Sequence, residues 1–163
     1  MSDQKSIQKA KTIMLEVVTP YHHFFEGKVE SVVLSALDGE YGVLPGHEPV
    51  VLALTPGIAH VTVKGVLRHA VMTEGYAEIG PYMVLVVCNA AEWADEIDVK
   101  RAYSALNRAT KRFHDASQSK QEHIFARHSI RRAKMRLKAI SLYGTTEQKK
   151  TLENLSKEEV NRP

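Results

Sequence analysis

The chain of 163 residues is long enough for one full domain and a smaller appendage, and its 44% hydrophobic and 25% charged content is ordinary for a soluble globular protein. Its one cysteine, Cys88, cannot form an internal disulfide, and within the apolar run YMVLVVCNAA we expect it to be a buried packing residue rather than a nucleophile. No apolar run approaches the roughly 20 residues that span a bilayer, and the N-terminus resembles neither a secretory signal nor a transit peptide. Any contact with a membrane is therefore expected to depend on another subunit.

The net charge of +3 is unevenly divided along the chain. Residues 1–93 contain 6 Lys and Arg against 10 Asp and Glu, whereas residues 94–163 contain 16 against 9, so the two parts carry −4 and +7. The C-terminal part is therefore expected to meet an acidic partner.

Residues 12–92 are a succession of short β-rich runs separated by turn residues. Runs such as TIMLEVV, KVESVVLSAL, GIAHVTV and YMVLVVCNA are rich in β-branched residues and show no helical period between them. Strands at this spacing indicate an antiparallel sandwich or barrel.

The pattern changes to a helical period near Trp93. Asp95 is expected to cap the first helix, with Asp98 at the acidic position of a capping box. Two apolar stripes follow, on either side of the break HDASQSK: Ala102, Leu106, Ala109 and Phe113, then Ala126, Ile130, Ala133, Leu137 and Ile140. They predict an antiparallel helical hairpin over residues 93–143, of marginal stability because its apolar residues are few and small. Gly144 ends it, and residues 144–163 form a charged tail that is at most a short frayed helix.

The stretch DGEYGVLPGHEPV, residues 38–50, gathers a histidine and acids among glycines and prolines, as an active site would. Its dipeptides Asp38-Gly39 and Pro45-Gly46 are turn signals on either side of a short strand. We therefore interpret it as architecture that places Glu40 and His47 on the surface at one end of the sandwich.

Four segments resemble the epsilon subunit of the bacterial and chloroplast F-type ATP synthase, the homologue of the mitochondrial delta subunit: VVTP, GEYGVLPGHEPVV, TEGYAEIGPYMVLVVCNAAE and IDVKRA, in one unbroken order within residues 12–143. The resemblance implies an N-terminal antiparallel β-sandwich of about ten strands followed by a C-terminal antiparallel α-helical hairpin. It implies a non-catalytic rotor subunit of the central stalk that supports proton- or sodium-driven ATP synthesis. The sandwich would contact the gamma subunit and the c subunits of the rotor ring, with Glu40 and His47 as our candidate contact residues.

The same resemblance implies a regulatory role for the hairpin. When folded on the sandwich, the hairpin would not inhibit the complex. When extended along gamma into the alpha and beta subunits, it would inhibit ATP hydrolysis. The protein would lie at the cytoplasmic side of the bacterial inner or plasma membrane, held there only by the complex. The residues expected to face the beta subunit in the extended state form a basic run: Arg127, Arg131, Arg132, Lys134, Arg136 and Lys138.

In some bacterial members of this family, the pattern I-D-x-x-R-A and two arginines four apart in the second helix form a regulatory ATP site. The matching residues here are Glu92, Ile97, Asp98, Arg101, Ala102, Arg132 and Arg136. Arginines converging from two helices would neutralise a polyphosphate. The alternative is that Asp98 only caps a helix and the arginines form a solvated face. ATP would be a regulatory ligand and not a required cofactor, because the sequence contains no P-loop.

Other functions have less support in the sequence. The basic run would suit the phosphates of RNA, so a β-sandwich interaction module with an RNA-binding helical tail remains the alternative function, although no base-stacking aromatic platform accompanies the run and we expect no nucleic-acid partner. A hydrolase would need a motif such as G-x-S-x-G or H-E-x-x-H, and neither is present. The eight histidines are too scattered to predict a metal site.

The chain extends beyond the family pattern at both ends. Residues 1–11 form an N-terminal extension, and about twenty residues follow the second helix. This tail would either lengthen the inhibitory insertion or remain in solvent.

Overall fold

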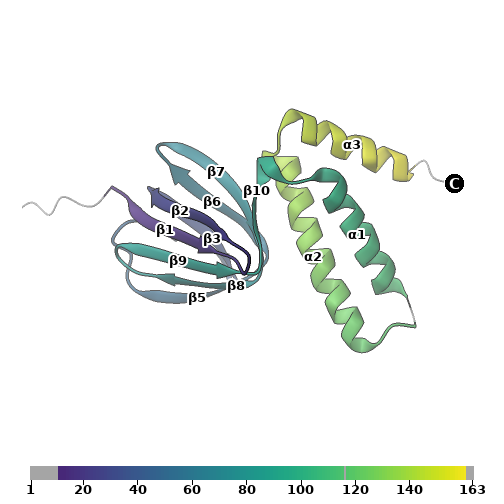
Figure 1. The fold of residues 1–163 in the computed structure, drawn as a ribbon, viewed down its shortest axis with the longest axis horizontal. Coiled ribbons are helices and arrows are strands. Elements are labelled where there is room, and N and C mark those ends of the chain that lie inside the picture. The colour runs from purple at the N-terminus through teal and green to yellow at the C-terminus, as the bar shows by residue number, and fades with distance from the viewer. Residues whose placement is uncertain (1–10, 116, 161–163) are drawn as a thin grey trace, which may run out of the picture.

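A computed structural model describes residues 11–115 and 117–160 of the chain. They form a β-sheet domain and a helical domain joined end to end, with all the strands in the first and all the long helices in the second (Figure 1). Apart from Lys11, the predicted N-terminal extension lies outside the described residues.

Ten strands build the sheet: β1 (Ile13–Val18), β2 (His23–Val29), β3 (Ser31–Ala36), β4 (Gly39–Val43), β5 (Val50–Leu54), β6 (Gly57–Val63), β7 (Val66–Met72), β8 (Gly75–Ile79), β9 (Met83–Cys88) and β10 (Ala91–Trp93). They are ordered β10-β7-β6-β3-β5-β8-β9-β1-β2, with β4 paired to β3. All pairs are antiparallel except β1 with β9, which run parallel. The sheet curls into a nearly closed sandwich, which confirms the predicted fold (Figure 1).

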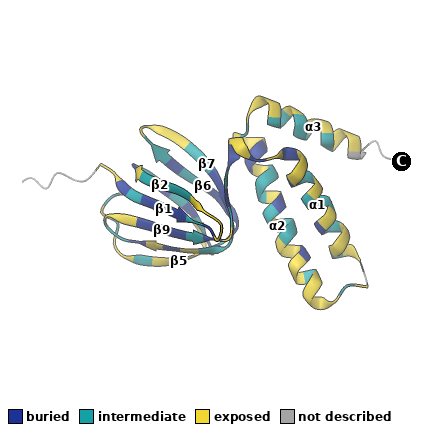
Figure 2. Cartoon of the chain, in the orientation of Figure 1, coloured by how far each residue is buried: buried dark blue, intermediate teal, exposed yellow. Residues whose placement is uncertain are grey.

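The core of the sandwich follows from the period of two in its strands. In β1 the residues Ile13, Leu15 and Val17 are buried and their neighbours are half-buried, because successive side chains point to opposite faces of the sheet. Trp93 of β10 closes one side of this core and packs on Phe24, with 4.9 Å between ring centroids. Buried residues run along the inside of the strands (Figure 2).

Three helices and a short turn follow the sandwich: η1 (Ala94–Glu96), α1 (Val99–His114), α2 (Lys120–Tyr143) and α3 (Thr146–Val160). The predicted N-cap at Asp95 is wrong: Asp95 lies within η1, a 3-10 turn, and Asp98 caps α1 by accepting a hydrogen bond from the backbone N–H of Arg101 at 2.9 Å. The acid expected to support the cap is therefore itself the cap.

Local hydrogen bonds fix the turn between α1 and α2. Ser119 and Glu122 form a reciprocal capping box at the start of α2, which lowers the pKa of Glu122. Hydrogen bonds from the side chains of Gln118 and Ser117 lower the pKa of Asp115 to about 2. The predicted hairpin is present, with α1 and α2 packed along their length (Figure 1).

A second hydrophobic cluster, separate from the sandwich core, joins the two domains. We call it the junction cluster, and its buried members are Ile58, Val71, Ala94, Ile97, Val99, Ala102, Ala139 and Ile140. It combines two residues of the sandwich with the start of η1, the residue that follows η1, the start of α1 and the end of α2. The helical hairpin is therefore docked on the sandwich at one end only (Figure 1).

The charged segment after Gly144 forms a full helix. Residues of α3 contact both α1 and α2, and Leu152 and Leu155 pack against the junction cluster. The described part of the tail therefore lies against the protein and does not remain free in solvent. A role of the tail in lengthening the inhibitory insertion stays a prediction.

The loop after β4 is a tight turn at which the sequence signal was correct. The N–H of His47 donates to the carbonyl of Leu44 at 3.1 Å, and Gly46 takes a φ of 83° that favours glycine. The N–H of Gly46 donates to the carbonyl of Pro81 at 2.9 Å, which ties this loop to the turn between β8 and β9.

We expect Gly75→Ala to destabilise the sandwich. An added Cβ would lie 2.0 Å from the backbone oxygen of Val87 on the neighbouring strand, and a backbone atom cannot move aside as a side chain can. The unfolding free energy should fall by about 2 kcal/mol or more, as in overpacked cores. The measurement is urea denaturation followed by fluorescence of Trp93. The matched control is Gly42→Ala, where an added Cβ meets no atom within 4 Å; equal stability of the two variants would contradict the packing argument.

Candidate functional site

A cleft of about 520 Å³ lies where β10, η1 and the start of α1 face α2. Six of the seven residues predicted for a nucleotide site line it: Glu92, Ile97, Asp98, Arg101, Ala102 and Arg136. The side chains of His22, Phe24 and Arg108 complete its polar and aromatic wall. Of the six predicted residues, the structure brings together Glu92 and Arg136, which are 44 positions apart in the sequence.

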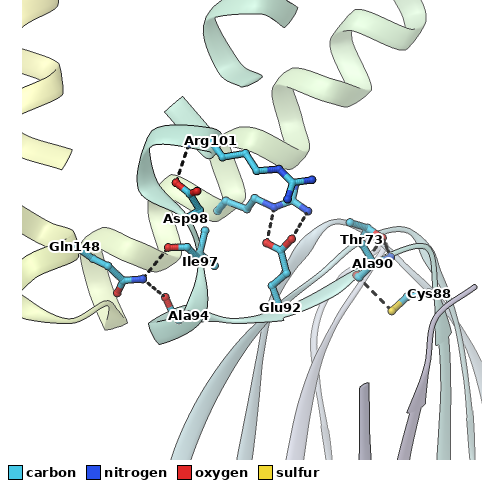
Figure 3. Close-up of polar contacts among 10 residues, drawn as sticks. Thr73, Cys88, Ala90, Glu92, Ala94, Ile97, Asp98, Arg101 and Gln148 are labelled. Atoms are coloured by element: carbon cyan, nitrogen blue, oxygen red, sulfur yellow. Dashed lines mark hydrogen bonds and ion pairs between the residues drawn. The ribbon is translucent and has the colours of Figure 1, made fainter. Parts of the chain in front are cut away.

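The start of α1 forms one wall of the cleft. Asp98 accepts from the backbone of Arg101 with one carboxylate oxygen, and the adjacent Ile97 is buried in the junction cluster (Figure 3). An N-terminus of a helix carries a partial positive charge and free N–H groups. The capping role that was the alternative for Asp98 is therefore real, and it leaves this residue at the edge of the cleft.

Glu92 and Arg136 face each other across the cleft. Nε of Arg136 donates to Oε2 of Glu92 at 2.8 Å, and a second guanidinium nitrogen donates to Oε1 at 3.3 Å (Figure 3). The arginine side chain is 22% exposed and the glutamate 39%. This two-point ion pair connects the last strand of the sandwich directly to α2.

Arg132, the seventh predicted residue, is not in the cleft. It lies one helical turn before Arg136 and points to Glu74 in the turn between β7 and β8, with 3.5 Å between Nη1 and Oε1. The carboxylate of Glu74 is buried and makes no hydrogen bond among the described residues. His128 also approaches it, at 3.5 Å. Sequence reasoning did not find this acid, because nothing near Glu74 indicates the helix that covers it.

The remaining residues of the predicted basic run lie on exposed positions of α2. Arg127, Arg131, Lys134 and Lys138 are exposed, and a guanidinium nitrogen of Arg131 donates to the hydroxyl of Thr55. The run is therefore divided: Arg131, Arg132 and Arg136 contact the sandwich, whereas Arg127, Lys134 and Lys138 are available to solvent.

Glu40 and His47, predicted as neighbouring partner contacts, lie at opposite ends of β4. Glu40 lines a shallow pocket with Lys138 and Tyr143 of α2, whereas His47 follows the far end of the strand. His47 is half-buried, stacks near Tyr41 with 5.4 Å between ring centroids, and contacts the carbonyl of Glu48 through Nδ1 at 2.7 Å. Their roles as contacts stay a prediction.

A histidine pair under the end of α2 was not found by sequence reasoning. Nδ1 of His60 lies 2.8 Å from Nδ1 of His69 on the neighbouring strand, and Tyr143 stacks on His69 with 3.6 Å between ring centroids. Burial and the adjacent His60 both lower the pKa of His69. The pair supports the last turn of α2 at the sandwich surface.

Two further expectations concern reactive groups. Cys88 is buried, and this burial raises the pKa of its thiol, as expected for a packing residue. Among the described residues, no three His, Cys, Asp or Glu side chains are grouped so that they could hold a metal ion. No helix in the described part of the chain has the length and apolar character needed to cross a bilayer.

Two family models match consecutive parts of the chain and define its class. The delta/epsilon chain β-sandwich domain of ATP synthase matches residues 12–94, and the long α-helix domain of the same chain matches residues 95–141. The chain thus belongs to the delta/epsilon class of ATP synthase subunits.

Relatives and solved structures agree with this class. An "ATP synthase epsilon chain" from Caldanaerobacter subterraneus subsp. tengcongensis is 37% identical over 82% of this chain and 96% of its own length, and one from Ruminiclostridium cellulolyticum is 39% identical over 78% and 95%. A chain in the structure of the Euglena gracilis mitochondrial ATP synthase, OSCP/F1/c-ring in rotational state 1, has the same fold, with a TM-score of 0.71, 22% identity, and coverage of 86% of this chain and 88% of that chain. The protein belongs to the family of ATP synthase epsilon chains.

Acidification below pH 6.5 is expected to destabilise the docked end of α2. The pKa of His69 is lowered in the folded protein, so the unfolded chain binds a proton more readily. The contribution is fully present above the ordinary pKa of 6.5 and is lost as pH falls from 6.5 through the lowered value. The measurement is the thermal midpoint at pH 7.5 and 5.5.

The variant His69→Phe keeps a ring against Tyr143 without the titrating group. Its midpoint should fall less on acidification than that of the unmodified protein. Comparing the two proteins removes the contribution of other groups, including His128 beside Glu74. Equal pH dependence in both would refute the role of His69.

Proposed function

We propose that this protein is the epsilon subunit of the central stalk of a bacterial F-type ATP synthase. In that role it links the gamma subunit to the c subunits of the rotor ring and regulates ATP hydrolysis by the alpha and beta subunits. It catalyses no reaction itself and associates with the cytoplasmic side of the inner or plasma membrane only through the complex. The family membership and the names of the relatives support this proposal.

The observation that carries the regulatory part is the separation of the two hydrophobic clusters. The sandwich core and the junction cluster share no residue, so the hairpin can leave without opening the core. Besides this small cluster, the hairpin is fixed by two acid–arginine pairs, Glu74 with Arg132 and Glu92 with Arg136, and by the contacts of Arg131 with Thr55 and of Tyr143 with His69. Contacts of this size suit an element that docks and releases.

The end of the sandwich near His47 has the character of a contact surface for the rotor. Leu44 is 60% exposed and Tyr82 is 80% exposed. The hydrogen bond from Gly46 to Pro81 holds their two loops together. Large apolar side chains on adjoining, fixed loops are typical of a protein interface.

In the extended state, the basic run would meet an acidic surface of the catalytic subunits. Its exposed members already lie on the outside of the docked hairpin, and release from Glu74 and Glu92 would free Arg132 and Arg136 as well. The contact is expected to weaken with added salt, because it depends on charge.

We further propose ATP as a regulatory ligand of the cleft. Arg101 and Arg136 reach it from two helices, and Phe24 and the buried Ile97 offer apolar surface to a base. Arg136 is paired with Glu92, so bound phosphates would compete with that carboxylate. ATP that bridges α1 and α2 would favour the docked state.

Removal of residues 95–163 tests the regulatory role in the assembled complex. The sandwich retains its core, so the shortened protein should still co-purify with the other subunits. ATP hydrolysis by the complex should be equal or higher, because the inhibitory segment is missing. A complex that hydrolyses ATP more slowly than the unmodified one would contradict inhibition by the hairpin.

A titration of the isolated subunit with ATP tests the ligand. Arg136→Ala and Asp98→Ala should weaken binding by at least about tenfold, the usual effect of a lost charged hydrogen bond. The control is Arg127→Ala, an exposed arginine of the same helix outside the cleft. Absence of binding to the unmodified protein at millimolar ATP would sink the proposal.

Arg132→Ala answers a separate question in the same titration. If ATP draws this arginine away from Glu74, its removal should weaken binding as much as that of Arg136. Unchanged affinity would show that Arg132 only docks the hairpin.

A further inference from the structure

We propose that α3 is a clamp that holds the helical hairpin in its docked position. The inference deepens the proposed function, since it assumes that the hairpin can move. The two matched family ranges end at residues 94 and 141, both before this helix, and the curated relative that is covered over 96% of its length accounts for only 82% of this chain. The clamp is therefore an addition to the fold that the family shares.

One side chain, Gln148, connects α3 to the junction between the domains. Its Nε2 donates to the carbonyl of Ile97 at 2.9 Å and to that of Ala94 at 3.2 Å (Figure 3). Its Oε1 accepts from the backbone N–H of Thr145 at 2.7 Å, while Thr145 caps the helix by accepting from the N–H of Gln148. The same amide group therefore starts α3 and ties that start to the junction.

Apolar contacts extend this connection along α3. Leu152 and Leu155 pack against the junction cluster, which contains Ala102 of α1 and Ile140 of α2. Close to Gly144, Nζ of Lys149 donates to the carbonyl of Leu142 at the end of α2. The helix thus covers the cluster on which docking depends.

The geometry of release explains why these contacts oppose it. Gln148 follows α2 by a few residues and so must move with the end of α2. The carbonyls of Ala94 and Ile97, in contrast, belong to the segment directly after β10, which stays attached to the sandwich. When the end of α2 moves away from η1, both hydrogen bonds break and the two leucines lose the cluster. Release of the hairpin therefore requires release of α3.

The test is hydrogen–deuterium exchange on the isolated full chain, without nucleotide or other subunits. The variant Gln148→Glu keeps an oxygen that can accept from Thr145, but it replaces the donor to the two carbonyls with a second oxygen that repels them. The matched control is Glu147→Gln, the opposite exchange at the adjacent exposed position. A second variant, Leu155→Ser, removes an apolar contact instead of the polar one.

Exchange should rise about fivefold or more at residues 97–105 and 133–143 in Gln148→Glu and Leu155→Ser, the usual effect of a lost hydrogen bond or apolar contact. Residues 13–88 of the sandwich should be unchanged, as should the whole of Glu147→Gln. Rates in α1 and α2 equal to those of the control would overturn the clamp. Rapid exchange throughout α3 in the unmodified protein would overturn it as well.

Hydrolysis by the assembled complex separates this inference from the proposed function. Faster exchange in Gln148→Glu supports the clamp whatever the complex does. If hydrolysis is also more strongly inhibited, the released hairpin is the inhibitor. Unchanged hydrolysis together with faster exchange would count against inhibition by the hairpin and not against the clamp.

Discussion

The arrangement of the two domains depends on one small apolar contact, the junction cluster. Ile140 at the end of α2 and Ile97 before α1 are both buried there, against Ile58 and Val71 of the sandwich. Beyond this point the helices are held by helix–helix packing and by a few polar contacts of α2 with the sandwich, such as Arg131 with Thr55 and Arg132 with Glu74. Burial of a few aliphatic side chains contributes on the order of 1.5–3 kcal/mol each before conformational entropy is subtracted, so polar contacts and α3 decide how firmly the hairpin is docked.

The polar contacts have a common design, since arginines of α2 reach acids that belong to the sandwich. Arg136 finds Glu92 on β10, and Arg132 finds Glu74 in a turn. Both arginines are also the residues expected to bind polyphosphate or the beta subunit. Glu74 and Glu92 would therefore compete with ATP and with the beta subunit for the same two arginines. Docking of the hairpin, nucleotide binding and inhibition of hydrolysis would then depend on the same side chains.

The sequence was sufficient for the order of the elements, because this order depends on local patterns, and the family resemblance was what indicated most of the residues that line the cleft. Period-two runs predicted the strands, spacings of three and four predicted the hairpin, and IDVKRA marked the start of α1. It was insufficient where distant residues meet. Nothing near Glu74 or His69 indicates the helix that covers each of them, and Gln148 bonds to carbonyls 51 and 54 positions away. The cap was misplaced because η1 inserts a turn between Asp95 and α1, and α3 was underestimated because its two leucines stand in a charged segment.

The division of the junction cluster between the domains makes release asymmetric. Of its buried members, Ile58 and Val71 of the strands would stay behind together with Ala94 and Ile97 of the connecting segment, while Val99, Ala102, Ala139 and Ile140 would leave with the helices. The sheet surface exposed by release would carry two aliphatic side chains, Ile58 and Val71, which is too small an apolar patch to promote association of the sandwich with other proteins. The released helices, in contrast, would expose an apolar stripe that is buried in the docked state and would need another protein surface to bury it. If the proposed extended position covers that stripe, the hairpin would be stable in the two positions and unfavourable in between, and would behave as a two-position element.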